Sequence, residues 1–298
     1  MSPRSLVRLG LRLAAALVAG GLSATPALAL TYLDHDVARV VSLGGACANC
    51  ELSGRKLIGA TFAGANFDGA TLVGADLRGA VLIASNFKDG NFTRADLREA
   101  HLVGARFDAA VFVDAHMQGV EAHGAQFGDA NLTGAQLENA VLVGSVFRDA
   151  TLTHANFAGA EMTMVKLADV NAAGANFTGA HMVGADLTEG SFQHASFKGA
   201  ELTAAHLGQA GFEGADFTGA VLRGADLKRA DLSGAKGLTQ AQVDTACTDR
   251  ATILPRGLYP RGCMPIHLVL HRAAKSPALP APPAPPAPPR IIASSDGR

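Results

Sequence analysis

Large apolar residues recur at every fifth position over most of this chain. Counting from Leu52 to Leu232 gives 37 such positions without one insertion, of which Leu occupies 18, Phe 14, Met three and Ala two. We call this the central position. Two residues before it, 28 of the 37 positions are Ala, and two residues after it, 20 of the 37 are Gly. The period fits neither the three- and four-residue spacing of an amphipathic helix nor the alternation of a strand.

A period of five with a turn-prone Gly in many units predicts a chain that bends at every unit. The central residue and the small residue two places before it would face inward, and the other three positions would face outward. Such an internal repeat overrides the one or two domains that a length of 298 residues would otherwise suggest. Central residues stacked coil on coil would form ladders, as in other β-solenoids.

Several units make the sequence resemble the pentapeptide repeat family: A-N-F-D-G at 65–69, A-D-L-R-G at 75–79, A-N-L-T-G at 130–134 and A-D-L-K-R at 225–229. The resemblance implies an all-β fold, a right-handed quadrilateral β-helix with four units per coil and short N- and C-terminal caps. At twenty residues per coil, the repeat would make about nine coils. A spacing of about 4.8 Å between coils would give a rod on the order of 45 Å long.

Four units per coil also sort the central residues into ladders. One ladder begins with Phe and ends with Leu, and a second does the reverse. The first holds Phe67, Phe87, Phe107, Phe127, Phe147, Leu167, Leu187, Leu207 and Leu227; the second holds Leu57, Leu77, Leu97, Met117, Leu137, Phe157, Phe177, Phe197 and Phe217. Phe changes ladder half-way along, which predicts that the core volume of each coil must stay constant.

The segment before the repeat is predicted to direct export. Residues 1–29 carry three arginines and no acidic residue, contain an apolar run over 11–22, and end on Ala27-Leu28-Ala29, which is the pattern of a secretory signal peptide. The alternative is a membrane anchor over 13–30, which is disfavoured because that stretch is rich in Gly and Ala and contains Pro26. We therefore expect a periplasmic or secreted bacterial protein without a stable membrane span after cleavage.

The rest of the chain divides into four parts. Residues 30–51 would form an N-terminal cap with a Cys pair, 52–235 the β-helix, 236–272 a C-terminal cap with a short helix and a second Cys pair, and 273–298 a disordered proline-rich tail. In the C-terminal cap, Thr239 and Gln242 have the spacing of a capping box, which predicts that a helix begins there.

The four cysteines flank the repeat: Cys47 and Cys50 precede it, and Cys247 and Cys263 follow it. A rod on the order of 45 Å would keep the two pairs apart, whereas a disulfide needs Cα atoms within about 7 Å. The expected disulfides are therefore Cys47–Cys50 and Cys247–Cys263, although the first pair could also be free. A redox or c-type haem motif at C-A-N-C is disfavoured, because Glu51 stands where haem attachment needs His.

No catalytic, cofactor or metal motif stands out from the repeat, so we predict none. His154 and His194 would lie two coils apart, too far to share an ion, and His101, Glu121 and His123 would lie on adjacent coils of one face. Exposed polar decoration is the preferred interpretation of both groups. Removing residues 1–29 would lower the net charge from −1 to about −4. A protein with this charge lacks the excess of basic residues that is typical of nucleic-acid-binding proteins.

One outward face is unusually apolar, and we predict that it contacts a protein partner or a second copy. Exposed apolar patches often mark contacts, although β-branched residues also suit an ordinary strand surface. The face would carry Val81, Ile83, Val103, Val141, Val143 and Val183, continued by Val221.

The predicted function is that of a non-catalytic exported scaffold for protein interaction. The resemblance implies one alternative, since some members of the family mimic DNA and bind a topoisomerase such as gyrase; the signal peptide and the weak charge disfavour it. A second alternative, a carbohydrate-active β-helix enzyme, would need a groove lined with acids or a metal, and the sequence offers neither.

Overall fold

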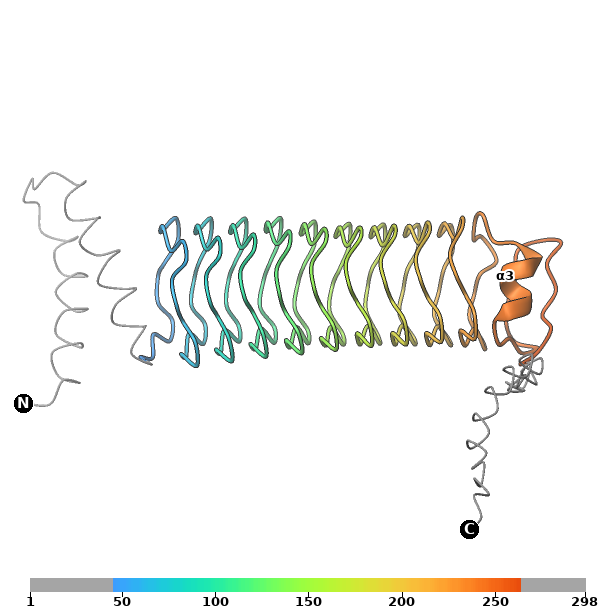
Figure 1. Cartoon of the computed structure of the whole chain (residues 1–298), viewed down its shortest axis with the longest axis horizontal. Coiled ribbons are helices and arrows are strands. Elements are labelled where there is room, and N and C mark those ends of the chain that lie inside the picture. The colour runs from blue at the N-terminus through green and yellow to red at the C-terminus, as the bar shows by residue number, and fades with distance from the viewer. Residues whose placement is uncertain (1–44, 264–298) are drawn as a thin grey trace, which may run out of the picture. The chain divides into compact units, whose positions relative to one another are not determined.

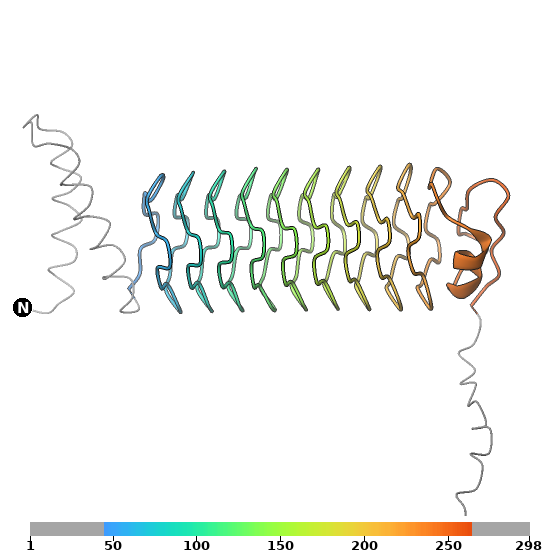
Figure 2. The ribbon, with the colours of Figure 1, turned by 45° about the horizontal axis from the view of Figure 1, so that its top comes forward.

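The computed structural model describes residues 45–263, which form one solenoid of stacked coils (Figures 1 and 2). The predicted signal peptide (1–29), residues 30–44 of the predicted N-terminal cap, and everything after Cys263, including the proline-rich tail, lie outside the described residues.

Each coil of the solenoid contains twenty residues. Parallel β-bridges join Thr61 to Val81, Val81 to His101 and His101 to Glu121, and the same spacing continues to Val221. Three further columns of bridges have the same period, so the coil has four sides. The fold is a right-handed quadrilateral β-helix, as the resemblance implies.

A tight turn closes each five-residue unit. In the unit after Leu57, the N–H of Ala60 donates to the carbonyl oxygen of Leu57 at 3.0 Å, and Gly59 between them has a φ of 63°. This is the geometry of a type II turn, whose third residue needs positive φ. Every fifth residue from Gly54 to Arg229 has positive φ, which explains why Gly recurs two places after the central position.

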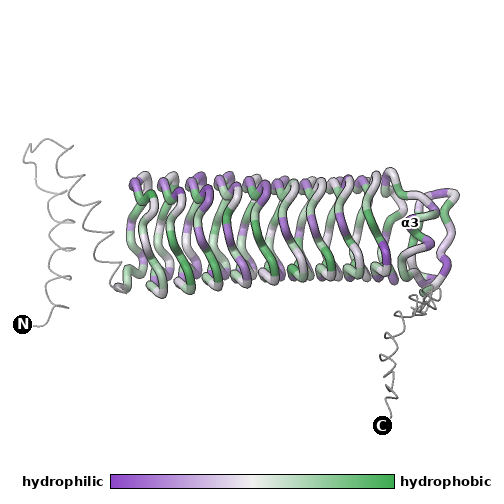
Figure 3. The backbone as a smooth tube through the Cα atoms, in the orientation of Figure 1, coloured by the Kyte–Doolittle hydropathy of each residue, from purple (hydrophilic) through white to green (hydrophobic). Residues whose placement is uncertain are grey.

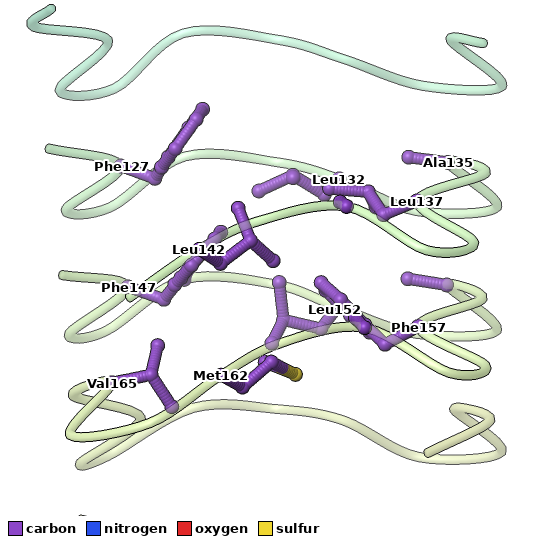
Figure 4. Packing of buried hydrophobic residues seen from close by; sticks show 14 of the residues in the cluster. Phe127, Leu132, Ala135, Leu137, Leu142, Phe147, Leu152, Phe157, Met162 and Val165 are labelled. Atoms are coloured by element: carbon purple, nitrogen blue, oxygen red, sulfur yellow. The ribbon is translucent and has the colours of Figure 1, made fainter. Parts of the chain in front are cut away.

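The core consists of the central side chains and the small side chains two places before them. All 37 central residues are buried. Figure 3 shows apolar and polar segments alternating along the coils. In Figure 4, Phe127 and Leu137 point into the interior from one coil, and Phe147 and Phe157 point inward at the same places on the next coil. Each such burial contributes roughly 1.5–3 kcal/mol.

Stacked phenylalanine rings run along the core and change ladder half-way. In the first ladder, Phe67 stacks on Phe87 with ring centroids 4.8 Å apart, and stacking continues to Phe147. In the second ladder, stacking runs from Phe157 to Phe217. The ladders meet where Phe147 and Phe157 touch edge to face at 6.1 Å. Each coil between Phe67 and Phe217 thus keeps at least one phenylalanine ring while the stack moves across the core.

The hydrogen-bonded register begins one unit before Leu52, where the sequence places the first repeat. Ala46 bridges Asn66, and the N–H of Cys47 donates to the carbonyl of Asn66 at 2.7 Å. Cys47 therefore occupies a central position, and Cys50 the inward position two places before Leu52. The sequence pattern misses this unit because its central residue is Cys instead of Leu or Phe.

Helix α3 (Gln240–Thr245) closes the C-terminal end of the solenoid. Thr239 is its N-cap, and Thr239 and Gln242 form the predicted capping box. The helix takes the place of one side of the last coil, the side that would follow Val221. The next two sides form bridges again, from Asp226 to Cys247 and from Asp231 to Ile253. Val243 of α3 is fully buried, and the amide nitrogen of Gln242 donates to the carbonyl oxygens of Phe217 and Ala220 at 3.0 and 2.8 Å. The cap thus covers the core and donates hydrogen bonds to two backbone carbonyl groups of the last full coil.

Candidate interaction surface

The solenoid brings the predicted apolar residues onto one side, which we call the valine-rich face. Its first column holds the residues before the central positions of that side: Thr61, Val81, His101, Glu121, Val141, Glu161, His181, Glu201 and Val221. Its second column holds the residues after them: Ala63, Ile83, Val103, His123, Val143, Thr163, Val183, Thr203 and Arg223. Successive members of each column lie one coil apart, so residues far apart in sequence form one continuous strip.

Exposed apolar side chains gather on this face. Seven large hydrophobic residues of the described chain are exposed, and four belong here: Ile83 (40%), Met164 (66%), Val183 (37%) and Val221 (41%). The others are Ile58 on another side, and Ile253 and Tyr259 at the C-terminal cap. Val81, Val103, Val141 and Val143 are half-buried between their column neighbours. Apolar area is thus concentrated on one side of the rod, as expected for a contact surface.

The third outward column of this face is almost free of side chains. It consists of the residues with positive φ at the turns, namely Gly64, Ala84, Gly104, Gly124, Gly144, Met164, Gly184, Ala204 and Gly224. Small residues leave this edge flat, so another protein surface can approach closely. Met164 is the exception, and the sequence prediction overlooked it because that prediction considered only β-branched residues. A methionine in a column otherwise made of Gly and Ala is the signal that would have identified it.

Histidine and glutamate interrupt the valines. Nδ1 of His101 lies 2.8 Å from Oε2 of Glu121 on the next coil. Glu161 and Glu201 each accept a hydrogen bond from the hydroxyl group of the threonine two residues later, Thr163 and Thr203. These carboxylates are therefore held along the surface, next to the valines.

A neighbouring side shows the contrast. Asp76 and Asp96 each accept two side-chain hydrogen bonds from the guanidinium group two residues later, Arg78 and Arg98. Those hydrogen bonds are the main reason that the pKa values of both aspartates lie below their ordinary range. These arginine–aspartate pairs place fixed charges on that side, next to the apolar side chains of the valine-rich face.

The histidines considered for metal binding do not form a ligand set. His101 contacts Glu121, but His123 does not join them. The rings of His154 and His194 each lie against a glycine of the next coil, Gly174 and Gly214. Among residues 45–263, no three His, Cys, Asp or Glu side chains come together in a way that could hold a metal ion.

Both cysteine pairs are bonded in the pairing that the rod length requires. Cys47 and Cys50 form one disulfide, with their Cα atoms 5.4 Å apart, and Cys247 and Cys263 form the other, with Cα atoms 4.1 Å apart. The first lies beside the core at the start of the solenoid, and the second ties the final segment to the bridge at Asp226. The disulfides therefore hold the two ends rather than the valine-rich face.

Helices long and apolar enough to cross a membrane do not occur within the described part of the chain.

Comparison with known proteins identifies the repeat. A family model described as pentapeptide repeats matches in eight copies, over residues 47–82, 91–129, 130–166, 166–203 and 200–236. A search of curated proteins gave no significant match.

Solved structures resemble the solenoid. HetL, a pentapeptide repeat protein from the cyanobacterium Nostoc sp. strain PCC 7120 involved in heterocyst differentiation regulation, is 26% identical, with a TM-score of 0.56 over 74% of this chain and 98% of its own. QnrB1, a plasmid-mediated fluoroquinolone resistance protein, is 22% identical, with a TM-score of 0.41 over 70% of this chain and 92% of its own. A protein of the Arabidopsis thaliana thylakoid lumen is 25% identical, with a TM-score of 0.20 over 44% and 70%.

Proposed function

This chain belongs to the pentapeptide repeat family, and we propose that it is a non-catalytic, exported scaffold that binds a protein through its valine-rich face. The observation that carries the proposal is the gathering of Ile83, Met164, Val183 and Val221, all exposed, on one flat side of the rod. Exposing apolar side chains to water has a free-energy cost, which contact with a partner would remove.

The hydrogen bonds of other polar side chains also support a scaffolding role. The carboxamide oxygens of Asn91 and Asn131 each accept from the hydroxyl group of the threonine two residues later, at 2.7 Å. Asn86 donates to Asn66 one coil earlier at 2.8 Å. These groups stabilise the turns and the stacking of coils, so they support the rod rather than a reaction.

Export is supported by the disulfides and by the signal-like residues 1–29. Disulfides persist in oxidising compartments such as the bacterial periplasm or the outside of the cell. Cell fractionation of the full chain tests this part of the proposal: the protein should appear outside the cytosol, shortened by about 29 residues. Full-length protein with free thiols in the cytosol would contradict it.

The interaction itself is tested with a triple variant, Val81→Lys, Ile83→Lys and Val143→Lys. These outward charges should abolish self-association in sedimentation and capture of partners from periplasmic extract, with the melting temperature nearly unchanged. The matched control places lysines ten residues earlier, on the opposite side of the coil, through Thr71→Lys, Val73→Lys and Thr133→Lys. Equal binding by the two triple variants would contradict a role for the valine-rich face.

The topoisomerase alternative requires a strongly acidic surface, and the charge of the rod is mixed. One side does carry Asp129, Asp149, Asp169 and Glu189 at successive turns. Arg148 lies 3.8 Å from Asp169, however, and Lys166 is exposed in the same strip. We therefore prefer the scaffold. Clear inhibition of supercoiling by the mature protein would reverse this order.

A further inference from the structure

The first column of the valine-rich face is complementary to its own reverse. Between the ends of the strip it reads Val81, His101, Glu121, Val141, Glu161, His181, Glu201 and Val221. Reversed and laid beside itself, the column sets valine against valine at its ends and histidine against glutamate in the next two positions. The constant spacing of one coil makes this alignment possible, because opposing columns have the same repeat.

We propose that the partner on the valine-rich face is a second copy of this chain, packed face to face with its rod antiparallel. The twofold axis would lie in the interface, between the coils of Val141 and Glu161. Val81 would then contact Val221 of the partner subunit, and His101 would contact Glu201 of the partner subunit. This inference rests on the proposed function, because it names the protein that the face binds.

This arrangement pairs two glutamates of the first column with histidines of the opposing copy. Glu121 and Glu201, two of the three glutamates of the face, each meet an imidazole group, from His181 and His101 respectively. A carboxylate moved out of water is costly unless it is paired and hydrogen-bonded. Glu161 meets Val141 close to the axis, where Oε1 of Glu161 already accepts from Thr163.

The second column contains no repulsive pair. In the same alignment, Ile83 meets Arg223, Val103 meets Thr203, His123 meets Val183, and Val143 meets Thr163. The aliphatic stem of Arg223 can cover Ile83 while its guanidinium group stays in water. Met164 of the third column would lie over Gly144 of the opposing copy, where no side chain blocks it.

A parallel pair of rods fits less well. That arrangement would place the first column of one copy against the second column of the other at the same coil. His101 would then meet Val103, His181 would meet Val183, and Glu121 alone among the glutamates would meet a histidine. Electrostatic complementarity selects orientation and register in interfaces of this kind, and here it favours the antiparallel dimer.

Disulfide cross-linking between introduced cysteines tests the relative orientation of the two rods directly. Val81 and Val221 of one chain lie seven coils apart, about 34 Å at strand spacing, so they cannot join within a chain, whereas a disulfide needs Cα atoms within about 7 Å. In the antiparallel dimer they face each other across the interface. The full chain, its native disulfides formed, is prepared as Val81→Cys, as Val221→Cys and as the double variant, then oxidised and analysed by non-reducing electrophoresis.

On the gel, the double variant should run as a covalent dimer. Each single variant should run as a monomer, because its new cysteine faces a valine of the partner subunit. The control is Thr71→Cys with Gly211→Cys, seven coils apart on the opposite side, which should not cross-link. Strong cross-linking of Val81→Cys alone would contradict the antiparallel dimer, in which this position faces Val221 of the partner subunit, and would overturn the proposal. Equal cross-linking of the control pair would show random collision and overturn it too.

Dimer affinity gives an independent readout. Because the face is one strand wide, we expect a dissociation constant on the order of micromolar in sedimentation equilibrium. His101→Glu should weaken the dimer about tenfold, because it sets two carboxylates against each other, and adding Glu201→His should restore it. A monomer at about 100 µM would overturn the dimer. If partner capture were still lost in the Val81, Ile83 and Val143 lysine variant, the proposed scaffold would stand without it.

Discussion

The imidazole ring of His154 covers Gly174, the residue at the equivalent turn one coil further along. A Cβ atom on Gly174 would lie 2.5 Å from Nδ1 and 2.7 Å from Cε1 of that ring. His194 covers Gly214 in the same way, and Asp114 covers Gly134. A side chain on a left-handed turn residue therefore leans toward the next coil, and a glycine there gives it room.

Replacing Gly174 with Ala should destabilise the solenoid through two separate effects. An L-residue with left-handed backbone costs about 1–2 kcal/mol, and the new Cβ would also displace His154. Gly179→Ala is the matched control, because Gly179 has a φ of 66° and nothing within 4 Å of a Cβ. We expect Gly174→Ala to lower the urea midpoint more than Gly179→Ala does. Adding His154→Ala should make the two equal; equal midpoints without it would contradict the role of the ring.

Ala204 offers the reverse experiment. It has a φ of 56° and an exposed side chain, so Ala204→Gly removes backbone strain. Glycine also gains freedom in the unfolded chain, so the net stabilisation should be about 0.5–1 kcal/mol. The neighbouring Ala205 is fully buried and its φ is not positive, so Ala205→Gly should destabilise instead. Thermal melts followed by circular dichroism measure both; a lower melting temperature for Ala204→Gly would contradict the strain argument.

The sequence predicted the repeating parts of this molecule well, because each unit reports its own role. The five-residue period identified the inward positions, and local spacing identified the capping box of Thr239 and Gln242. It missed contacts that depend on a neighbouring coil. Nothing local marks Cys47 as a central residue, and nothing local shows that Gln242 reaches the carbonyl of Phe217, 25 residues earlier.

The sequence predicted the candidate surface in outline, but it missed a detail that depends on neighbouring coils. The twenty-residue coil places the valines on one side once four units per coil are assumed. That Met164 stands out from its flat column depends on neighbours twenty residues away. The same spacing placed His101 and Glu121 on adjacent coils of one face, and the structure adds that Nδ1 of His101 contacts the Glu121 carboxylate.

Gln242 should be among the residues of α3 whose loss most weakens the C-terminal cap. Its carbonyl oxygen accepts from the N–H of Thr239 at 2.8 Å, and its amide group donates to Phe217 and Ala220. Gln242→Ala removes these bonds and the one that Oε1 accepts from the hydroxyl group of Thr239, at about 0.5–1.5 kcal/mol each. Gln242→Glu keeps the acceptor but loses the donors. Hydrogen exchange of α3 should therefore increase in the order wild type, Glu, Ala. A Glu variant that exchanges as slowly as wild type would mean that the donors contribute nothing, and equal rates in the two variants would mean the same of the acceptor.

Acid should weaken the rod partly through Asp76 and Asp96. The guanidinium groups of Arg78 and Arg98 donate hydrogen bonds to these carboxylates and hold their pKa values below the ordinary one. A pKa depressed by folding adds stability above the unfolded-state value, near pH 4, and that stability is lost as the pH falls through the folded-state value.

Denaturation midpoints of wild type and the double variant Asp76→Asn, Asp96→Asn, measured between about pH 7 and pH 2, test this. The wild type should be the more stable above about pH 4, and the difference should shrink as the acid protonates both carboxylates. The control double variant, Asp114→Asn with Asp129→Asn, removes two exposed carboxylates on other sides of the coil. It should not reproduce the pH dependence of the Asp76 and Asp96 variant. A constant difference for the Asp76 and Asp96 variant as well would show that the arginine pairs do not contribute to acid sensitivity.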